Sequence, residues 1–183
     1  MTPIFVTSNE NKRREVEGML GLSLEAASPE VPEIQSLDFS EVVRVKAFAA
    51  REALGSPSRV VIVEDSGLVV EAWNGLPGAL TKWFLASVGN EGLLKMLSPF
   101  EERAARAVCA VAVIDGVGEA AVFVGEVEGK IAGEQRGEGG FGWDPIFIPG
   151  GGDLTYAEMG EEKHRDSHRA RAFRSVGKWL EGR

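Results

Sequence analysis

Two adjacent acids, Glu64 and Asp65, are the residues of this sequence whose types and position best suggest chemistry. They follow residues 60–63, four β-branched residues in a row that predict a strand buried on both faces. Acidic residues are depleted inside strands and costly to bury unpaired, so we expect the buried strand to end at them. Ligands usually bind at the carboxyl ends of such strands. A ligand-binding crevice and a solvated acidic turn explain this stretch equally well.

A second stretch, residues 7–12, is suited to binding phosphate. It follows a short apolar strand and precedes an apolar helical pattern, and Thr7 and Glu10 have the spacing of a capping box. A strand-to-helix turn presents backbone N–H groups and the positive end of the helix dipole. Asn9 adds an amide donor and Lys12 a positive charge. Any capped helix start gives a similar pattern, so this signal is weak alone.

A glycine-rich turn places an aromatic residue where a nucleobase could stack. Four glycines lie within residues 137–142, and they let the backbone approach a ligand closely. Phe141 stands between two of them, with Trp143 and Asp144 next to it. Base–aromatic stacking contributes about 1–3 kcal/mol per base. A core aromatic in a glycine-rich turn is the alternative.

The charge distribution favours a small polyanion over nucleic acid. The whole chain carries a net charge of −8, whereas basic residues outnumber acidic ones over residues 163–183. An acidic protein with one basic segment suits a small polyanion held beside a cation site, although charge alone favours an ordinary solvated helix. His168 has no partner at metal-ligand spacing, so a hydrogen-bonding role at a helix start is expected rather than zinc binding.

The composition predicts one globular domain spanning residues 1–183. Apolar residues make up 44%, and the chain is long enough for a real core. Cys109 is the only cysteine, so a buried, inert thiol is expected. The sequence starts without a signal-peptide pattern, and its longest apolar run, residues 108–114, is too short to span a bilayer. We therefore expect a soluble cytoplasmic protein.

The helix expected before residue 60 brings a third acid into consideration. Ser36 or Asp38 begins it and Gly55 ends it, with Glu41 in the first turn. Because the helix dipole favours an acid there, capping is the simpler role for Glu41. The apolar pattern predicts an inward face formed by Val42, Val45 and Ala49.

Two long β runs and an interrupted helix complete the expected elements. Residues 104–114 and 119–127 have strand character and are joined at Asp115-Gly116, a strong hairpin signal. Their length predicts an antiparallel arm or an extended edge of the main sheet. The helix after residue 81 is expected to break near Gly89.

Six segments, in this order, resemble the inosine triphosphate pyrophosphatase family, also called Ham1-like. They extend from residue 7 to residue 169, and together they are specific although each is weak. The matching segments are Thr7-Ser8-Asn9-Glu10-Asn11-Lys12, Glu64-Asp65-Ser66-Gly67-Leu68, Gly75-Leu76-Pro77-Gly78, Gly140-Phe141-Gly142-Trp143-Asp144-Pro145-Ile146-Phe147, Thr155-Tyr156-Ala157-Glu158-Met159, and Lys163 with Ser167-His168-Arg169.

The resemblance implies an α/β fold, with an elongated mixed sheet flanked by helices and two lobes around a central cleft. It implies a Mg²⁺-dependent enzyme, usually homodimeric, that hydrolyses purine nucleoside triphosphates with a 6-keto base (ITP, dITP and XTP). The products are the monophosphate and pyrophosphate, and the role is cleansing of the nucleotide pool.

The resemblance also implies roles for individual residues. Asp65 resembles the general base, and the metal carboxylates are expected to be Glu41, Asp65 and, as a helper, Glu64. Since successive strand residues point in opposite directions, Glu64 and Asp65 are not expected to face the cleft together. The phosphates would be neutralised by Asn9, Lys12, Lys82 and Lys163. The full set of expected substrate contacts is Thr7, Ser8, Asn9, Lys12, Ser66, Lys82, Phe141, Gly142, Trp143, Asp144, Lys163, His168 and Arg169.

Base choice is expected from hydrogen bonding to the 6-keto oxygen. A donor aimed at that position accepts inosine and is left unpaired by the 6-amino group of adenine, which can reject the wrong base by on the order of 10⁴-fold. Guanine also has a 6-keto oxygen, so its rejection needs a second device.

Three positions depart from the family pattern. Ser8 stands where Gly is common, His164 replaces the usual Asn, and Asp166 stands where a small or apolar residue is usual. An acid at 166 could pair with Arg169 or raise the pKa of His168. These departures concern base specificity rather than the reaction.

Two other functions remain open at this level. One is a Maf-type pyrophosphatase acting on pyrimidine nucleotides. The other is a nucleotide-binding module without catalysis, against which the acidic pair argues, because carboxylates without a metal repel phosphate.

Overall fold

The computed structural model describes residues 2–55, 58–116 and 118–182. Its centre is a mixed seven-stranded sheet in the order β2-β1-β3-β5-β6-β7, with β4 paired to β3. β1 runs parallel to β2 and β3, and the remaining pairs are antiparallel. The strands are β1 (Ile4–Val6), β2 (Glu25–Ala27), β3 (Val61–Val70), β4 (Pro77–Gly78), β5 (Ala104–Ile114), β6 (Ala121–Ile131) and β7 (Phe147–Pro149).

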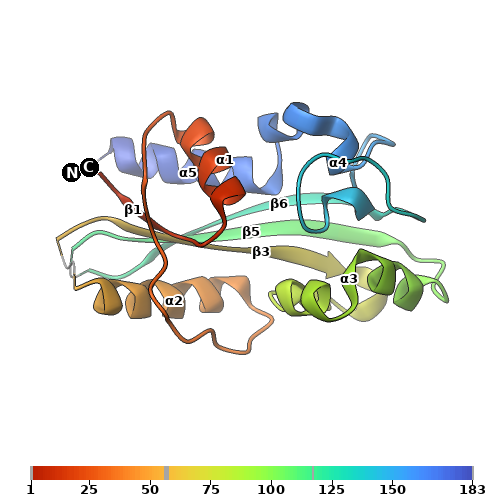
Figure 1. Cartoon of the computed structure of the whole chain (residues 1–183), viewed down its shortest axis with the longest axis horizontal. Coiled ribbons are helices and arrows are strands. Elements are labelled where there is room, and N and C mark those ends of the chain that lie inside the picture. Colours follow the sequence, from red (N-terminus) through yellow and green to blue (C-terminus); the bar gives the residue numbers. More distant parts are fainter. Residues whose placement is uncertain (1, 56–57, 117, 183) are drawn as a thin grey trace.

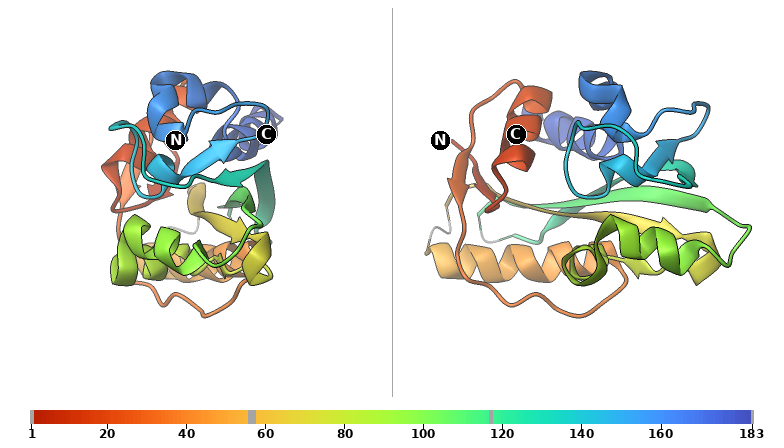
Figure 2. Two further views of the ribbon diagram at one scale, coloured as in Figure 1. Left: turned by 90° about the vertical axis from the view of Figure 1, so that its right-hand side faces the viewer. Right: turned by 45° about the vertical axis from the view of Figure 1, so that its right-hand side comes forward.

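Helices cover the sheet from two sides. In Figure 1, α1, α4 and α5 lie above the long strands and α2 and α3 lie below them, and both views of Figure 2 show the same layers. None of the described helices is long and apolar enough to cross a membrane. The helices are α1 (Glu10–Leu20), α2 (Phe39–Leu54), α3 (Thr81–Leu97), α4 (Tyr156–Met159) and α5 (His168–Glu181), with short 3₁₀ helices η1 (Glu71–Trp73), η2 (Asp144–Ile146) and η3 (Gly160–Arg165).

The apolar core is divided between the two ends of the long strands. At one end, α2 packs on one face of the sheet through Val43 and Ala47, and α5 packs on the other through Phe173 and Val176. At the opposite end, a separate cluster joins β3 and β5 to α3, α4 and η2. This arrangement confirms the expected elongated α/β fold with two lobes, which β3 and β5 connect.

The edge of β3 has a gap between two short partners. β1 pairs with β3 through Val63, and β4 pairs with it from Leu68, so no strand in the described part of the chain covers residues 64–67 on that edge. On its other edge β3 pairs with β5 along its whole length. The expectation that the strand ends at the acids was therefore wrong, because pairing with β5 keeps Glu64 and Asp65 extended in mid-strand.

Helix boundaries confirm most turn signals but correct two details. Gly21 and Gly55 end α1 and α2, Asp38 caps α2, and α3 is kinked at Gly89 as expected. However, Asn9 caps α1 in place of a Thr7–Glu10 capping box. In α2 the buried positions are Phe39, Val42, Val43, Ala47 and Ala50, so Val45, which is exposed, was wrongly placed inward.

The predicted hairpin strands exist, and within the described chain β6 pairs with β7 only at residues 129–131, so most of its outer edge is open as expected, whereas the place of β5 differs from the expectation. β5 lies between β3 and β6, and nine of its eleven residues are buried, namely Ala105 and residues 107–114. The strand is therefore internal rather than part of an arm or an edge. Small residues such as Ala107, Ala110 and Ala112 let helices from both layers pack closely on it.

Gly125 of β6 is required for the close approach of α5 to the sheet. A Cβ atom there would lie 2.2 Å from the His168 carbonyl oxygen and 2.5 Å from the Ala172 nitrogen. Both are backbone atoms that cannot move aside cheaply, so α5 would have to shift.

We expect Gly125→Ala to lower the free energy of unfolding by about 1–3 kcal/mol because it overpacks this contact. Urea denaturation measures the change. Gly133→Ala is the matched control, since no atom lies within 4 Å of the added Cβ, and it should change stability by no more than about 0.5 kcal/mol. Equal stabilities of the two variants would contradict the packing argument.

Candidate active site

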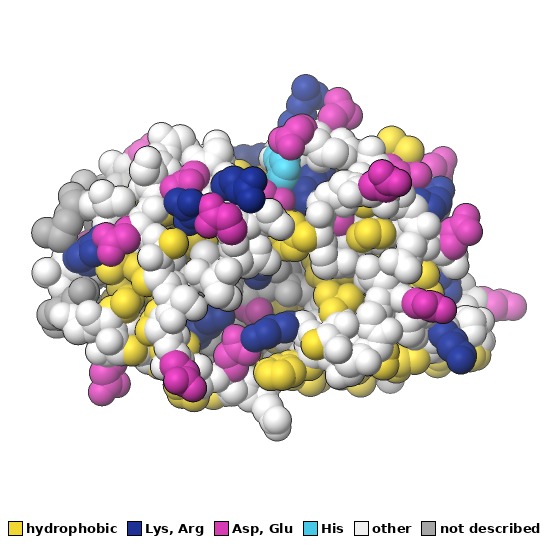
Figure 3. All heavy atoms as spheres, viewed as in Figure 1, with side chains coloured by type: hydrophobic (Ala, Val, Ile, Leu, Met, Phe, Trp, Pro, Cys, Tyr) yellow, Lys and Arg dark blue, Asp and Glu magenta, His cyan; other side chains and the backbone are white. Residues whose placement is uncertain are grey.

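A cavity of about 370 Å³ lies between the two lobes, at the unpaired edge of β3. One side is formed by the β1–α1 turn and α2, and the other by the start of α3 and the turn before η2. Figure 3 shows a hollow in the middle of this face, with basic and acidic side chains gathered around it. The gap in strand pairing gives a ligand access to both faces of β3.

The structure brings nearly all predicted site residues together around this cavity. The two that do not line it are Glu41 and Lys163. Glu41 is exposed in the first turn of α2 and accepts a hydrogen bond from Ser36 Oγ at 2.6 Å. Its metal-binding role stays a prediction. The residues that line the cavity as expected are Thr7, Ser8, Asn9, Lys12, Glu64, Asp65, Ser66, Lys82, Phe141, Gly142, Trp143, Asp144, His168 and Arg169.

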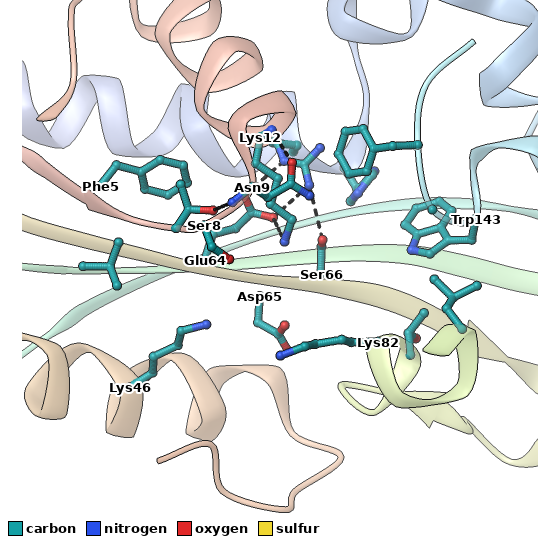
Figure 4. A pocket seen from close by; sticks show the side chains of 18 of the residues that line it. Phe5, Ser8, Asn9, Lys12, Lys46, Glu64, Asp65, Ser66, Lys82 and Trp143 are labelled. Atoms are coloured by element: carbon teal, nitrogen blue, oxygen red, sulfur yellow. Dashed lines mark hydrogen bonds and ion pairs between the residues drawn. The ribbon is translucent and has the colours of Figure 1, made fainter. Parts of the chain in front are cut away.

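Glu64 and Asp65 point to opposite faces of β3, as strand alternation requires (Figure 4). Glu64 lies on the side of α1 and α5, whereas Asp65 points toward Lys46 of α2 and Lys82 of α3. Both nevertheless line the cavity, because the cavity wraps around the open edge of the strand. The expectation that only one of them faces the cleft was therefore wrong.

Glu64 is a buried carboxylate held by two cations. Its side chain is 1% exposed, Arg169 Nη2 lies 2.9 Å from Oε1, and Lys12 Nζ lies 3.3 Å from the same oxygen. Burial raises the pKa of Glu64, but the charges of Arg169 and Lys12 outweigh that effect and hold the pKa below its usual range. Glu64 is thus ionised, and the charges of Arg169 and Lys12 compensate its own. It also holds the Arg169 side chain against the sheet.

Asp65 has the opposite environment. Burial raises the pKa of Asp65 to about 6, and the positive charges of Lys12 and Lys46 offset burial only in part. Its Oδ2 atom is buried and has no hydrogen-bond partner among the residues that the structure describes. A carboxylate with a free oxygen and a pKa nearer neutrality can accept a proton or bind a cation, which distinguishes it from Glu64.

Glu33 and Lys46 are cavity residues that the sequence interpretation missed. Glu33 pairs with Lys82 at 3.0 Å and with Lys46 at 3.4 Å, so it bridges α2 and α3 at the cavity that Asp65 also lines. Burial raises the pKa of Glu33, and the two lysines lower it by more. The sequence contained one signal for Lys46, because this charged residue stands next to Ala47 of the apolar face of α2.

The β1–α1 turn presents polar groups on the Glu64 side of β3 (Figure 4). Asn9 Oδ1 accepts hydrogen bonds from the backbone nitrogens of Asn11 and Lys12, at 3.0 and 3.2 Å. Thr7 Oγ1 accepts from the Asn9 nitrogen at 3.0 Å. Since the Asn9 oxygen is used in capping, its amide NH₂ group and the Lys12 ammonium are the donors that a bound anion would meet.

Phe141 forms the wall at the other end of the cavity. Lys163 Nζ and Arg169 Cζ lie 5.2 and 5.5 Å from the centre of its ring. Asp144 Oδ2 accepts from the Phe141 nitrogen at 2.9 Å, and a Cβ atom at Gly140 would lie 2.0 Å from that oxygen. The turn therefore needs glycine beside Phe141 so that Asp144 can hold the ring in place.

Lys163 does not line this cavity, and its expected role in neutralising phosphates stays a prediction. It is 6% exposed and forms ion pairs with Asp144 at 2.7 Å and with Glu15 at 3.1 Å. Glu15 of α1 also pairs with Arg169. Lys163 thus belongs to the network around Phe141, and Glu15, which sequence interpretation missed, connects that network to Arg169.

His168 lines the cavity as a neutral, buried ring. It stacks on Tyr156 with ring centres 5.8 Å apart and lies 5.0 Å from the Trp143 ring. Burial, assisted by the charge of Arg169, holds the pKa of His168 well below its usual value. Neither ring nitrogen has a partner in the described structure. His168 can therefore offer one donor and one acceptor to a ligand.

The predicted effects of Asp166 were wrong. Its carboxylate pairs with Arg171 at 2.6 Å and with Arg174 at 3.6 Å, because all three project from the exposed side of the α5 start. It does not pair with Arg169, and the pKa of His168 falls rather than rises.

The carboxylates of this cavity are suited to a metal ion that binds together with a ligand. They are less suited to a metal ion that the protein binds by itself. No group of three metal-ligating side chains occurs among the described residues. Mg²⁺, however, commonly uses one or two carboxylates and completes its shell with water and substrate phosphates. Asp65 Oδ2, which has no partner in the described part of the chain, and the Glu33 carboxylate, which lines the same cavity, meet that requirement.

Comparisons with known proteins agree with this geometry. The Ham1 family matches residues 3–179. A protein of Methanopyrus kandleri named dITP/XTP pyrophosphatase is 43% identical over 98% of this chain and 96% of its own length. An inosine triphosphate pyrophosphatase of Aspergillus fumigatus is 46% identical over 97% and 93%.

Solved structures show the same fold. A HAM1 protein from Coxiella burnetii superposes with a TM-score of 0.85 at 28% identity and covers both chains completely. The Staphylococcus aureus Ham1 protein gives a TM-score of 0.81 at 32% identity and covers 99% of each chain. By sequence and by fold, this chain belongs to the Ham1 family.

Proposed function

We propose that this chain hydrolyses purine nucleoside triphosphates with a 6-keto base (ITP, dITP and XTP) to the monophosphate and pyrophosphate. The observation that carries the proposal is the arrangement of one cavity, in which Asp65 lies between an aromatic end and a cationic end. An aromatic end with Phe141 and His168 suits a base, and a cationic end with Lys12, Lys46 and Lys82 suits a triphosphate. The names of the relatives, dITP/XTP pyrophosphatase and inosine triphosphate pyrophosphatase, support the same substrates.

In this proposal Asp65 accepts the proton of the water that attacks the α-phosphorus. A carboxylate whose pKa is about 6 is ionised at neutral pH and is still basic enough to take a proton. Lys12, Lys46 and Lys82 neutralise the charge that develops on the leaving pyrophosphate, which is most of what phosphoryl transfer requires.

Magnesium is part of the proposal, with Asp65 and Glu33 as the carboxylates that would hold it. Bound Mg²⁺ supplies charge neutralisation at the phosphate oxygens. Glu64 is less suited, because its side chain is buried in its ion pairs with Arg169 and Lys12, whereas the Glu33 side chain is partly exposed. On substrate binding, Lys46 and Lys82 would exchange Glu33 for phosphate oxygens.

The base end supports selection of a 6-keto purine. Phe141 offers a face for stacking. Neutral His168, together with Lys163 and Arg169 beside the Phe141 ring, offers donors to a keto oxygen. An amino group at position 6 would leave such donors unpaired. A homodimer in the cytoplasm that binds no nucleic acid remains a prediction from the resemblance and the composition.

A substrate panel tests the proposal. With Mg²⁺ present, we expect pyrophosphate release from ITP, dITP and XTP to exceed that from ATP by on the order of 10⁴-fold in kcat/KM. UTP and TTP should also be poor substrates. Faster turnover of UTP or TTP would favour a Maf-type enzyme, and tight ITP binding without turnover would favour a binding module.

We expect Asp65→Asn to lower kcat by on the order of 10²–10⁴-fold, because the base is lost.

In metal-free protein Asp65→Asn should also raise stability at pH 8. The pKa of Asp65 is about 6 folded against an ordinary 3.8, so ionisation destabilises the fold progressively between these values and fully above pH 6. The gain should vanish below pH 4, as thermal unfolding with a chelator can measure. Full activity of the variant would refute the assignment.

Glu33 and Glu41 can be compared directly as the second carboxylate. Because Glu33 lines the cavity and Glu41 does not, we expect Glu33→Gln to raise the Mg²⁺ concentration needed for half-maximal activity at least about tenfold. Glu41→Gln should have the smaller effect. The reverse order would restore Glu41 as the principal ligand.

A further inference from the structure

A second cavity, of about 400 Å³, continues from the phosphate end of the active-site cavity. The two share the β1–α1 turn and the ion-paired residues between α2 and α3, namely Val6, Thr7, Ser8, Glu33, Lys46 and Lys82. Beyond them the second cavity runs between the loop at residues 28–31 and Trp83. In the proposed binding mode, with the phosphates at Lys46 and Lys82, it lies beyond the end of a triphosphate. We call it the distal groove.

The walls of the distal groove change from charged to largely apolar with distance from the active site. Lys46 and Lys82 stand at the junction, and Pro29, Val31 and Trp83 line the far part. Glu30 also lines it and is exposed. An acid beside apolar walls disfavours further phosphates. It is compatible with an uncharged group attached to the end of the phosphate chain.

Trp83 offers a surface on which a second base could stack. Trp83 is 56% exposed, more than any other large hydrophobic residue that the structure describes. Lys82 Nζ lies 5.1 Å from the centre of its ring, so a phosphate-binding cation and an exposed aromatic plane are adjacent. Aromatic planes next to cationic grooves are the usual platform for bases joined to phosphate.

We propose that the distal groove binds the second nucleoside of a dinucleoside 5′,5′-polyphosphate, and that such compounds with a 6-keto purine are substrates. The inference rests on the proposed function, because it needs the first base at Phe141 and the phosphates at the lysines. Phe141 and Trp83 then hold the two bases at the two ends of one continuous channel.

The reaction is the same hydrolysis with a larger leaving group. For P¹,P⁴-di(inosine-5′) tetraphosphate, the water oxygen bonds to the α-phosphorus and the bond from that phosphorus to the bridging oxygen breaks. Asp65 takes the water proton and returns it to solvent. The products are inosine monophosphate and inosine triphosphate, so no oxidant or co-reactant is needed. The triphosphate released is itself a substrate and yields pyrophosphate in a second turnover.

The test compares initial rates on ITP and on diinosine tetraphosphate in wild-type protein and two variants, with products separated by chromatography. Trp83→Leu removes the stacking plane. Phe100→Ala is the matched control, because Phe100 is another exposed aromatic, 42% exposed, that lines neither cavity. Inosine 5′-tetraphosphate, which extends the phosphates without a second base, is the third substrate.

We expect wild-type protein to release inosine monophosphate and triphosphate together from diinosine tetraphosphate. In Trp83→Leu, kcat/KM for this substrate relative to that for ITP should fall roughly 5- to 150-fold, which corresponds to about 1–3 kcal/mol of stacking. The ratio for inosine tetraphosphate should change less than twofold, and Phe100→Ala should leave both ratios unchanged.

Three results would overturn the inference. Turnover of ITP without turnover of diinosine tetraphosphate would reject it and leave the proposed function standing. Turnover of both, with the same ratio in Trp83→Leu, would show that the distal groove does not hold the second base. No turnover of ITP would reject the proposed function and this inference together.

Discussion

The site depends on the different desolvation of two neighbouring carboxylates on β3. Glu64 turns toward α1 and α5, where Arg169 and Lys12 compensate its charge, so it is ionised and engaged. Asp65 turns toward α2 and α3, where burial exceeds compensation and the pKa rises to about 6. One peptide unit thus separates a structural anion from a reactive one. Strand alternation imposes this division, and the gap on the edge of β3 makes both accessible.

The rest of the fold can be understood as support for that gap. The short partners β1 and β4 end on either side of it, and β5 keeps β3 straight on the opposite edge. Separate cores at the two ends of the sheet hold the β1–α1 turn and the Phe141 turn at fixed positions facing each other. Gly125 brings the start of α5 against β6, so that His168 and Arg169 reach the cavity.

Local patterns in the sequence predicted the elements and most of the cavity lining. Gly21, Gly55 and Asp38 act through their own backbone conformation or a contact within one turn, so their roles could be read locally. The internal position of β5 could not, because strand order depends on pairing between distant segments. The acids of β3 were misjudged for the same reason, since β5 rather than local preference extends the strand.

The residues that were missed share a physical cause. Glu33 lies in an irregular loop and reaches the cavity only through Lys46 and Lys82 on two different helices. Glu15 lies in α1 and gains its importance from Lys163 and Arg169, about 150 positions away in sequence for the latter. Such roles arise from tertiary contacts between charges, so single-segment patterns do not contain them.

β3 separates Glu64, whose pKa lies below its usual range, from Asp65, whose pKa is raised, and a titration of the two carboxyl groups can measure this difference. In ¹³C NMR spectra of the metal-free protein, the Asp65 carboxyl carbon should titrate with a pKa near 6. The signal of the Glu64 carboxyl carbon should remain that of a carboxylate down to the lowest pH at which the protein stays folded. A pKa of Asp65 near the ordinary 3.8, or protonation of Glu64 at a higher pH than Asp65, would show that β3 does not divide the two carboxyl groups in this way.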